Sequence, residues 1–544
     1  MTLLDFPGEP PGARRPSGRL SRARAALAEA LFWLLPAALA GVQAAWIAQT
    51  DQLLRFEEVA EAVRSVYWLE HRALYDGIST NLGWYGLLLA VYRLFGFSLY
   101  TAKWVRLALH AGALLCLAWV LRRGLGRRAA PGSGPGGTPG SGLGPGRAAV
   151  PLLAVGLSPS ILFFNTLETS FGTDLLYLPY LLALLAVVPV AGGGARRFLD
   201  AAARAAFGAL AMVAWMSYPV FAFYLPALAW AYVSRTTGSA GPGSGRWPSR
   251  LAARSLLPAI AGFLLPLGAA VAWLERPARL FHDPATGSGL FRGGGTGLDL
   301  EPSAVAWNAA RALRDLFLRG RSYYFWVESP DLAGPLGLLA AAAVAAGSVW
   351  LCRHRPELRP WIVLAWLLPA ANLLAVSASE GPQGLRRATS LLAGCYLLYT
   401  LVWREATAPA AVGEGERRAA VPRLRAALAL GLVLLPLHHL GSAALQYPLL
   451  PWAGTEQTHL WLRIAPSAAE SLDLWLERTA AGEALDCRAL ALEPERCQYG
   501  GIFALLSGYR RWNGLPPVPL RGYDYGSERF VELSVARLSG EFSR

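Results

Sequence analysis

The chain has 544 residues, of which 54% are hydrophobic and 16% are charged. Soluble globular proteins carry about 25% charged residues, so this composition excludes an ordinary soluble enzyme and indicates an integral membrane protein. The net charge of +14 comes mostly from arginines in short loops between apolar runs. Such a distribution is typical of the cytoplasmic loops of membrane proteins, and we expect no nucleic-acid partner.

The first part of the chain predicts a tail and an anchor. Residues 1–25 are basic and rich in proline and glycine, and we predict a cytoplasmic tail. The apolar run from about Ala26 to Ala48 has membrane-spanning length and predicts a first transmembrane helix. A secretory signal peptide is the competing interpretation, but no small-residue cleavage site stands out.

The segment after this helix, 49–100, is predicted to lie outside the cytoplasm and to carry membrane-surface helices. Apolar residues recur at helical spacing over 53–70, which favours an amphipathic helix on the membrane surface. Three acids, Asp51, Glu57 and Glu58, cluster near the end of the first span.

The remaining apolar runs predict a polytopic, all-α membrane protein. Further spans are expected at about 101–121, 148–165, 174–192, 255–274, 333–352, 360–377, 388–403 and 425–441. Residues 206–233 are also apolar but contain Pro219, and we predict two short helices broken there, because proline removes a backbone donor. About eleven spans result, with a cytoplasmic N-terminus, a C-terminus outside, and a transmembrane domain over 26–441.

The segments between and after the spans have their own compositions. Linkers rich in glycine, proline and serine at 129–147 and 235–250 are expected in the cytoplasm, and 275–332 is expected as an outer loop. The last segment, 442–544, is predicted to form a small mixed domain outside the cytoplasm. Cys487 and Cys497 fall in it and would form a disulfide in an oxidising compartment.

No ligand spacing in the chain indicates a metal or another cofactor. Cys116, Cys352 and Cys395 lie in or beside apolar runs without metal-type spacing. His438 and His439 lie at a span end without acidic neighbours in the sequence.

Two further turns on the predicted outer side carry ionisable residues. Glu168 and Asp174 lie between two spans, and Glu380, Arg386 and Arg387 lie between another two. Arginine binds phosphate through its planar fork of donors, and a carboxylate can deprotonate an attacking hydroxyl. These residues therefore predict a site for a lipid-linked phosphate, whereas the plain alternative is a set of charges that hold span ends in the interface.

Several stretches resemble, in the right order, one class of membrane enzyme. They are "RFEEVAEAVRSVYWLEH", "NLGWYGLLLAVYRLFGFSLYTAKWVRLAL", "LSPSILFFNTLETSFGTDLLYLPYLLALL", "GALAMVAWMSYPVFAFYLPAL", "SPDLAGPLGLLAAAAVAAG" and "SEGPQGLRRATSLLAGCYLL". Over roughly residues 25–405 this order is similar to that of GT-C class polytopic glycosyltransferases. The type is the bacterial glycosyltransferase family 39, related to protein O-mannosyltransferases and the aminoarabinose lipid A transferase.

The resemblance implies roles for individual residues. It places the catalytic base at Glu57 or Glu58, with Asp51 as a rival, because the usual Asp-Glu pair is replaced here by Glu-Glu. Asp174 matches the acid of the second loop. The residues predicted to bind substrate are Glu168, Glu380, Arg106, Arg386 and Arg387, and the resemblance places both members of the arginine pair near the lipid phosphate.

The implied reaction moves a sugar from a polyprenyl-phosphate donor to a lipid, glycan or protein acceptor, with inversion and without a cofactor. The implied place is the outer side of the bacterial cytoplasmic (inner) membrane, among membrane lipids. The second loop reads "NTLET" instead of the family's basic-aromatic start, which leaves open a degenerate member that binds lipid without catalysis. The spans and loops are also compatible with a polymerase or ligase of surface polysaccharide, and with a transporter or flippase.

Overall fold

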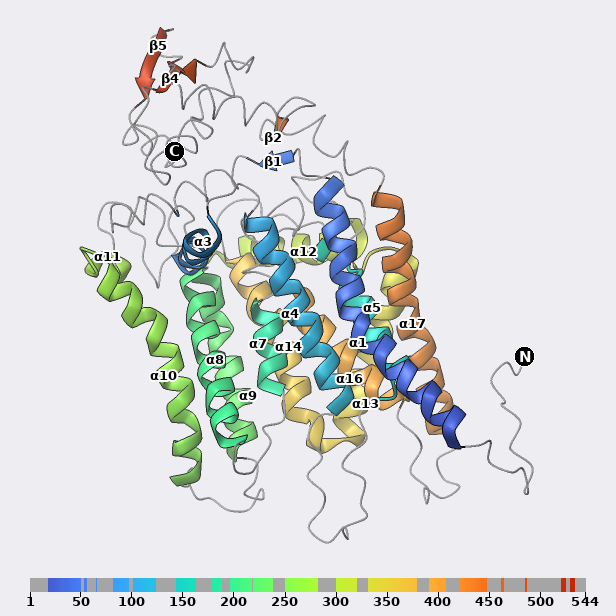
Figure 1. Ribbon diagram of the computed structural model, residues 1–544. Helices are drawn as coiled ribbons and strands as arrows, with labels where there is room; N and C mark the ends of the chain where they lie inside the picture. Colours follow the sequence, from blue (N-terminus) through green and yellow to red (C-terminus); the bar gives the residue numbers. More distant parts are fainter. Residues whose placement is uncertain are drawn as a thin grey trace, which may run out of the picture.

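Figure 1 shows the computed structural model of the chain, a bundle of long helices. The structure describes residues 18–49, 53–55, 65, 82–96, 101–123, 143–162, 178–187, 196–217, 219–237, 250–281, 300–319, 331–378, 391–407, 420–447, 461–463, 485–486, 520–524 and 529–533. The bundle confirms the predicted class of helical membrane protein.

The α-helices are α1 (Gly18–Gln49), α3 (Leu82–Phe95), α4 (Thr101–Arg123), α5 (Pro145–Gly156), α7 (Leu178–Val187), α8 (Arg196–Ser217), α9 (Leu225–Thr237), α10 (Arg250–Trp273), α11 (Ala278–Phe281), α12 (Pro302–Arg314), α13 (Gly334–His354), α14 (Arg359–Ser377), α16 (Leu391–Thr407) and α17 (Ala420–Gln446). Short helical turns are η3 (Pro219–Phe223), η4 (Asp315–Arg319, a π-helical turn) and η5 (Pro356–Leu358). The strands are β1 (Leu53–Arg55), β2 (Trp461–Arg463), β3 (Leu485–Asp486), β4 (Leu520–Asp524) and β5 (Arg529–Leu533).

Five of the described helices are long and apolar enough to cross a membrane. They are α1, α4, α10, α13 and α17, with apolar windows within 22–48, 101–122, 256–273, 334–354 and 422–445. Each coincides with a predicted span. The first helix begins at Gly18, however, so it extends into the segment predicted as a tail.

The break at Pro219 is confirmed. Helix α8 ends at Ser217, the 3-10 turn η3 follows, and α9 begins at Leu225. Proline has no backbone N–H and clashes with the preceding helical turn, so one continuous helix would lose a hydrogen bond there.

The span predicted over 148–165 is interrupted. Helix α5 ends at Gly156, and the amide of Ser158 donates to the carbonyl of Val155 at 3.2 Å instead of to the carbonyl of Ala154. Pro159 is the physical reason, because a proline disfavours helical backbone angles in the residue before it. The break frees the Ala154 carbonyl for a tertiary partner.

Helices α3 and α12 lie at the end of the bundle where α1 ends, which we call the outer end (Figure 1). Figure 1 shows α3 almost end-on while the long helices run down the view, so α3 crosses the bundle direction. Asn308 of α12 donates to the carbonyl of Ser377, at the last residue of α14, at 3.1 Å. Both helices thus lie where membrane-surface helices are expected.

The predicted surface helix over 53–70 is wrong at its start. Leu53–Arg55 forms strand β1, which pairs antiparallel with Trp461–Arg463. Backbone hydrogen bonds to a distant segment override the local helical spacing here. The pairing also puts the segment after α17 on the same side of the bundle as the segment after α1.

Arginine contacts connect helices at the opposite end of the bundle, which we call the inner end. Arg122 of α4 forms an ion pair with Glu29 of α1, and its Nε donates to Glu29 Oε1 at 3.1 Å. Arg355, which follows α13, lies 3.3 Å from Glu405 of α16. These contacts connect helices that are distant in the sequence.

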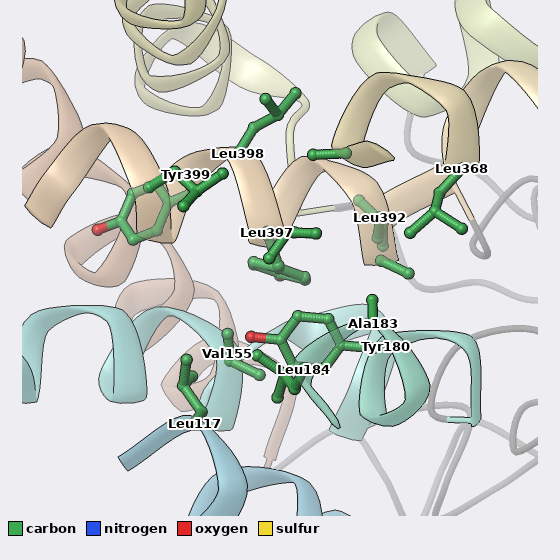
Figure 2. Close-up of a cluster of buried hydrophobic side chains, with 14 of the residues drawn as sticks. Leu117, Val155, Tyr180, Ala183, Leu184, Leu368, Leu392, Leu397, Leu398 and Tyr399 are labelled. Atoms are coloured by element: carbon green, nitrogen blue, oxygen red, sulfur yellow. The ribbon is translucent and has the colours of Figure 1, made fainter. Parts of the chain in front are cut away.

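The core lies between α4, α5, α7, α14 and α16. Figure 2 shows Leu117, Val155, Tyr180, Leu184 and Leu397 facing one another across these helices. Away from this core, α8 and α10 pack with their backbones in close approach, because a Cβ at Gly208 would overlap the carbonyl oxygen of Ala259.

Candidate functional site

Most of the predicted site residues lie outside the described residues. These are Asp51, Glu57, Glu58, Glu168, Asp174, Glu380, Arg386 and Arg387, together with the predicted disulfide partners Cys487 and Cys497. The structure does describe Arg106, and the candidate site is built around it.

Arg106 is fully buried in the first half of α4. Its guanidinium carbon lies 5.1 Å from the centroid of the Trp84 ring, which belongs to the surface helix α3. An arginine over the face of a tryptophan gains a cation–π attraction of about 2 kcal/mol when desolvated. The contact joins a membrane-crossing helix to a surface helix at the outer end.

Arg106 belongs to a set of buried basic residues, which we call the basic face of α4. Lys103, Arg106 and His110 follow the i, i+3, i+7 spacing of a single helix face, and each is at most 1% exposed. None of the three is without a partner. Ionisable residues inside membrane helices are costly and mark functional pathways or sites by default.

The basic face begins at the N-terminus of α4. Lys103 and Arg106 lie within about 8 Å of Thr101, the first helical residue, at 1.5 Å per residue. A helix N-terminus carries about half a positive charge and presents free N–H groups. The helix end, the ammonium and the guanidinium therefore all favour an anion at the outer end of the bundle.

A second buried polar group, which we call the Asp331 hub, consists of Asp331, Ser158, Ser160 and Tyr396. Asp331 precedes α13 and is fully buried. Its Oδ2 accepts hydrogen bonds from the hydroxyls of Ser158 at 2.7 Å and Tyr396 at 2.8 Å. Its Oδ1 accepts one from the backbone amide of Ser160 at 3.0 Å.

The three donors decide what Asp331 can do. These three hydrogen bonds occupy both carboxylate oxygens and leave little room for a substrate hydroxyl. The hub therefore holds structure together, because it joins the break after α5 to α16 and to the start of α13.

His439 of α17 completes this arrangement. Its Nδ1 lies 2.6 Å from the Ala154 carbonyl oxygen that the α5 break frees, and its Nε2 lies 3.2 Å from the backbone carbonyl of Asp331. A carbonyl oxygen only accepts, so Nδ1 is the donor in the shorter contact. No acidic residue lies near His439 in the sequence, but the fold brings the backbone carbonyl of Asp331, 108 residues away, against its ring.

Sequence reasoning missed the hub and Lys103. Lys103 is the single lysine of a chain that otherwise uses arginine. This exception could have marked it as a candidate site residue. Asp331 stands in the stretch "SPDLAG", but nothing local distinguishes it from a loop acid. Only the tertiary contacts with Ser158 and Tyr396 do so.

Among the described residues, no group of three or more His, Cys, Asp and Glu side chains is placed to hold a metal ion. The described residues thus offer two features, the buried basic face of α4 at the outer end and the hydrogen-bonded Asp331 hub. No protein-family model, curated protein or solved structure matches the chain.

Proposed function

We propose that the chain is a membrane glycosyltransferase of the GT-C type, which uses a polyprenyl-phosphate sugar as donor. The observation that carries the proposal is the basic face of α4, because it buries Lys103 and Arg106 at the outer end against Trp84. A lipid-linked phosphate is an anion that stays at the membrane surface, which is where this face begins.

The basic face would act on the leaving group. In the proposed step, an acceptor hydroxyl attacks the anomeric carbon while the bond between that carbon and the phosphate oxygen breaks. The displaced polyprenyl phosphate carries the negative charge, which Lys103 and Arg106 would stabilise as it develops. Attack from the opposite face inverts the anomeric centre.

The attacking hydroxyl needs a base, and the first-loop acids are our candidates. Glu57 and Glu58 follow β1 after one residue, Phe56. One of them would accept the proton of the acceptor hydroxyl, with Asp51 as the rival. The pair Arg386 and Arg387 would meet the same phosphate from the segment between α14 and α16.

We also infer an eleven-span topology for the bundle. The helices α5, α7, α8, α9, α14 and α16 would complete the crossings begun by the five longer apolar helices. The inner-end arginines, such as Arg122 and Arg355, favour a cytoplasmic inner end. The N-terminus would then be cytoplasmic and the C-terminal segment, tied by β2 to β1, would lie outside the bacterial inner membrane.

A transporter or flippase is the second candidate, and one observation favours it. Asp331 and His439 are both fully buried between helices, and buried acid and histidine residues occur in the proton relays of transporters. Against this, Asp331 already accepts three hydrogen bonds.

The test is donor turnover by the purified protein in nanodiscs, with a panel of polyprenyl-phosphate sugars and mixed acceptors. Wild type is expected to release polyprenyl phosphate, whereas Arg106→Gln is expected to lose donor affinity and Glu57→Gln or Glu58→Gln to lose turnover alone. Trp104→Phe is the matched control, because Trp104 lies on the exposed side of α4. If no donor binds, and if liposome assays show lipid movement that depends on Asp331, the transferase proposal is replaced by the transporter.

A further inference from the structure

A second feature lies in the outer half of the bundle, between α13, α14 and α16. It is an apolar cavity of about 340 Å³, which is within the range of small-molecule sites. Its lining includes Leu338 and Ala342 of α13, Trp366 of α14 and Tyr396 of α16, and Phe317 of η4 adds a further ring.

The cavity opens sideways toward the surrounding bilayer. Leu338 and Trp366 line it and are 38% and 47% exposed, so they form its rim. Their helix neighbours Leu339 and Val363 are exposed apolar residues as well. In a membrane-crossing protein, the hydrocarbon of the bilayer surrounds this rim. The hydrocarbon chain of a lipid is therefore the group that can enter the cavity.

The length of the cavity fits one leaflet. Its lining runs from Leu338 to Ala345 on α13 and from Leu392 to Tyr399 on α16, which is about 10 Å along each helix. Half of a bilayer's hydrocarbon core measures about 15 Å. On the inner side, Trp366 Nε1 donates to Ser348 Oγ at 3.3 Å and joins α14 to α13 one turn beyond Ala345.

The walls favour an unbranched chain. Helix α13 contributes four alanines to the lining, Ala340, Ala341, Ala342 and Ala345, together with Leu338 and Val344, so short side chains make up most of this wall. A straight acyl chain gains contact along a wall of this kind, whereas the regularly spaced methyl groups of an isoprenoid need wider space.

Two arginines come immediately before the turn that contributes Phe317 to the cavity. Arg311 and Arg314 occupy the last turn of α12, immediately before the π-helical turn η4 that places Phe317 in the lining. This helix lies at the outer end of the bundle, over α14 (Figure 1). A lipid whose chain enters the cavity would have its headgroup at this level.

We infer that the cavity between α13, α14 and α16 binds one acyl chain of an anionic phospholipid of the outer leaflet. Arg311 and Arg314 meet the phosphate of that lipid. The site is separate from the basic face of α4 and does not rest on the proposed transferase activity.

The test is photo-crosslinking in phosphatidylcholine nanodiscs that contain phosphatidylglycerol with a diazirine near the end of one acyl chain. Crosslinks are expected on the peptides around 338–345 and 392–399. Ala342→Trp fills the cavity and is expected to lose most of them. Ala346→Trp is the matched control, because it adds the same side chain at an exposed alanine of α13 outside the lining.

Two further arms identify the lipid. Arg311→Gln is expected to reduce labelling by phosphatidylglycerol toward the level of an equally labelled phosphatidylcholine. Equal labelling of wild type and Ala342→Trp overturns the site. If unlabelled polyprenyl phosphate abolishes the crosslinks and unlabelled phosphatidylglycerol does not, the inference that the cavity binds an acyl chain is overturned.

Discussion

Replacing Asp331 with alanine is expected to be one of the most destabilising single changes in the outer half of the bundle. The substitution removes the acceptor of three hydrogen bonds, and the amide of Ser160 cannot turn toward another partner. Leaving a buried polar group unpaired costs about 1–3 kcal/mol. The hydroxyls of Ser158 and Tyr396 can rotate and recover part of their loss, so we expect about 3–5 kcal/mol in total.

Asp331→Asn separates hydrogen bonding from charge. The asparagine oxygen can accept from the Ser160 amide, while its amide nitrogen faces the two hydroxyls, so the expected loss is only about 1–2 kcal/mol. Tyr396→Phe removes one donor and is expected to cost about 1 kcal/mol. The double variant should lose less than the sum of the single losses, because the residues are in contact.

The assay is equilibrium unfolding in mixed dodecylmaltoside and SDS micelles, followed by tryptophan fluorescence. The reasoning is refuted if Asp331→Ala lowers the free energy of unfolding by less than about 1 kcal/mol, the value of a single ordinary hydrogen bond. Additive losses in the Asp331→Asn and Tyr396→Phe double variant would show that the contact between these residues contributes no coupling.

Three further predictions concern other parts of the chain. If Glu57 or Glu58 is the catalytic base, its glutamine variant should turn over donor about 10²–10⁴-fold more slowly with unchanged donor binding. If Glu57→Gln and Glu58→Gln are both fully active, Asp51 becomes the candidate base. Gly208→Ala should lower the unfolding free energy by about 1–3 kcal/mol through overpacking against Ala259, whereas Gly268→Ala on α10, where a Cβ meets nothing within 4 Å, should not lower it. Cys487 and Cys497 should resist maleimide labelling in denatured, unreduced protein and react after reduction, and labelling without reductant would contradict an oxidised pair.

Much of the bundle could be predicted because its causes are local. Long apolar runs predicted the spans now seen as α1, α4, α10, α13 and α17, and the backbone chemistry of Pro219 predicted the break between α8 and α9. Pro159 has the same chemistry and interrupts α5. Its effect was missed because the apolar run continues through it.

The parts that escaped prediction depend on distant contacts. The three donors of Asp331 come from segments 65 to 173 residues away, and no periodicity encodes such a meeting. Strand β1 carries a helical pattern of apolar residues, but its partner lies near the other end of the chain. The cavity between α13, α14 and α16 depends on how far apart these apolar helices stand, which alanine-rich sequences leave undetermined.

The pairing of β1 with β2 has a consequence for the order of synthesis. Residues 53–55 are made early, but their partners at 461–463 are made about 400 residues later. At about 5–20 residues per second, the first segment waits roughly 20–80 s for its partner strand. During that interval the helices can already be inserted in the membrane, while strand β2 has not yet been made. A nascent chain released before Trp461 would therefore have its helices but lack the strand that pairs with β1.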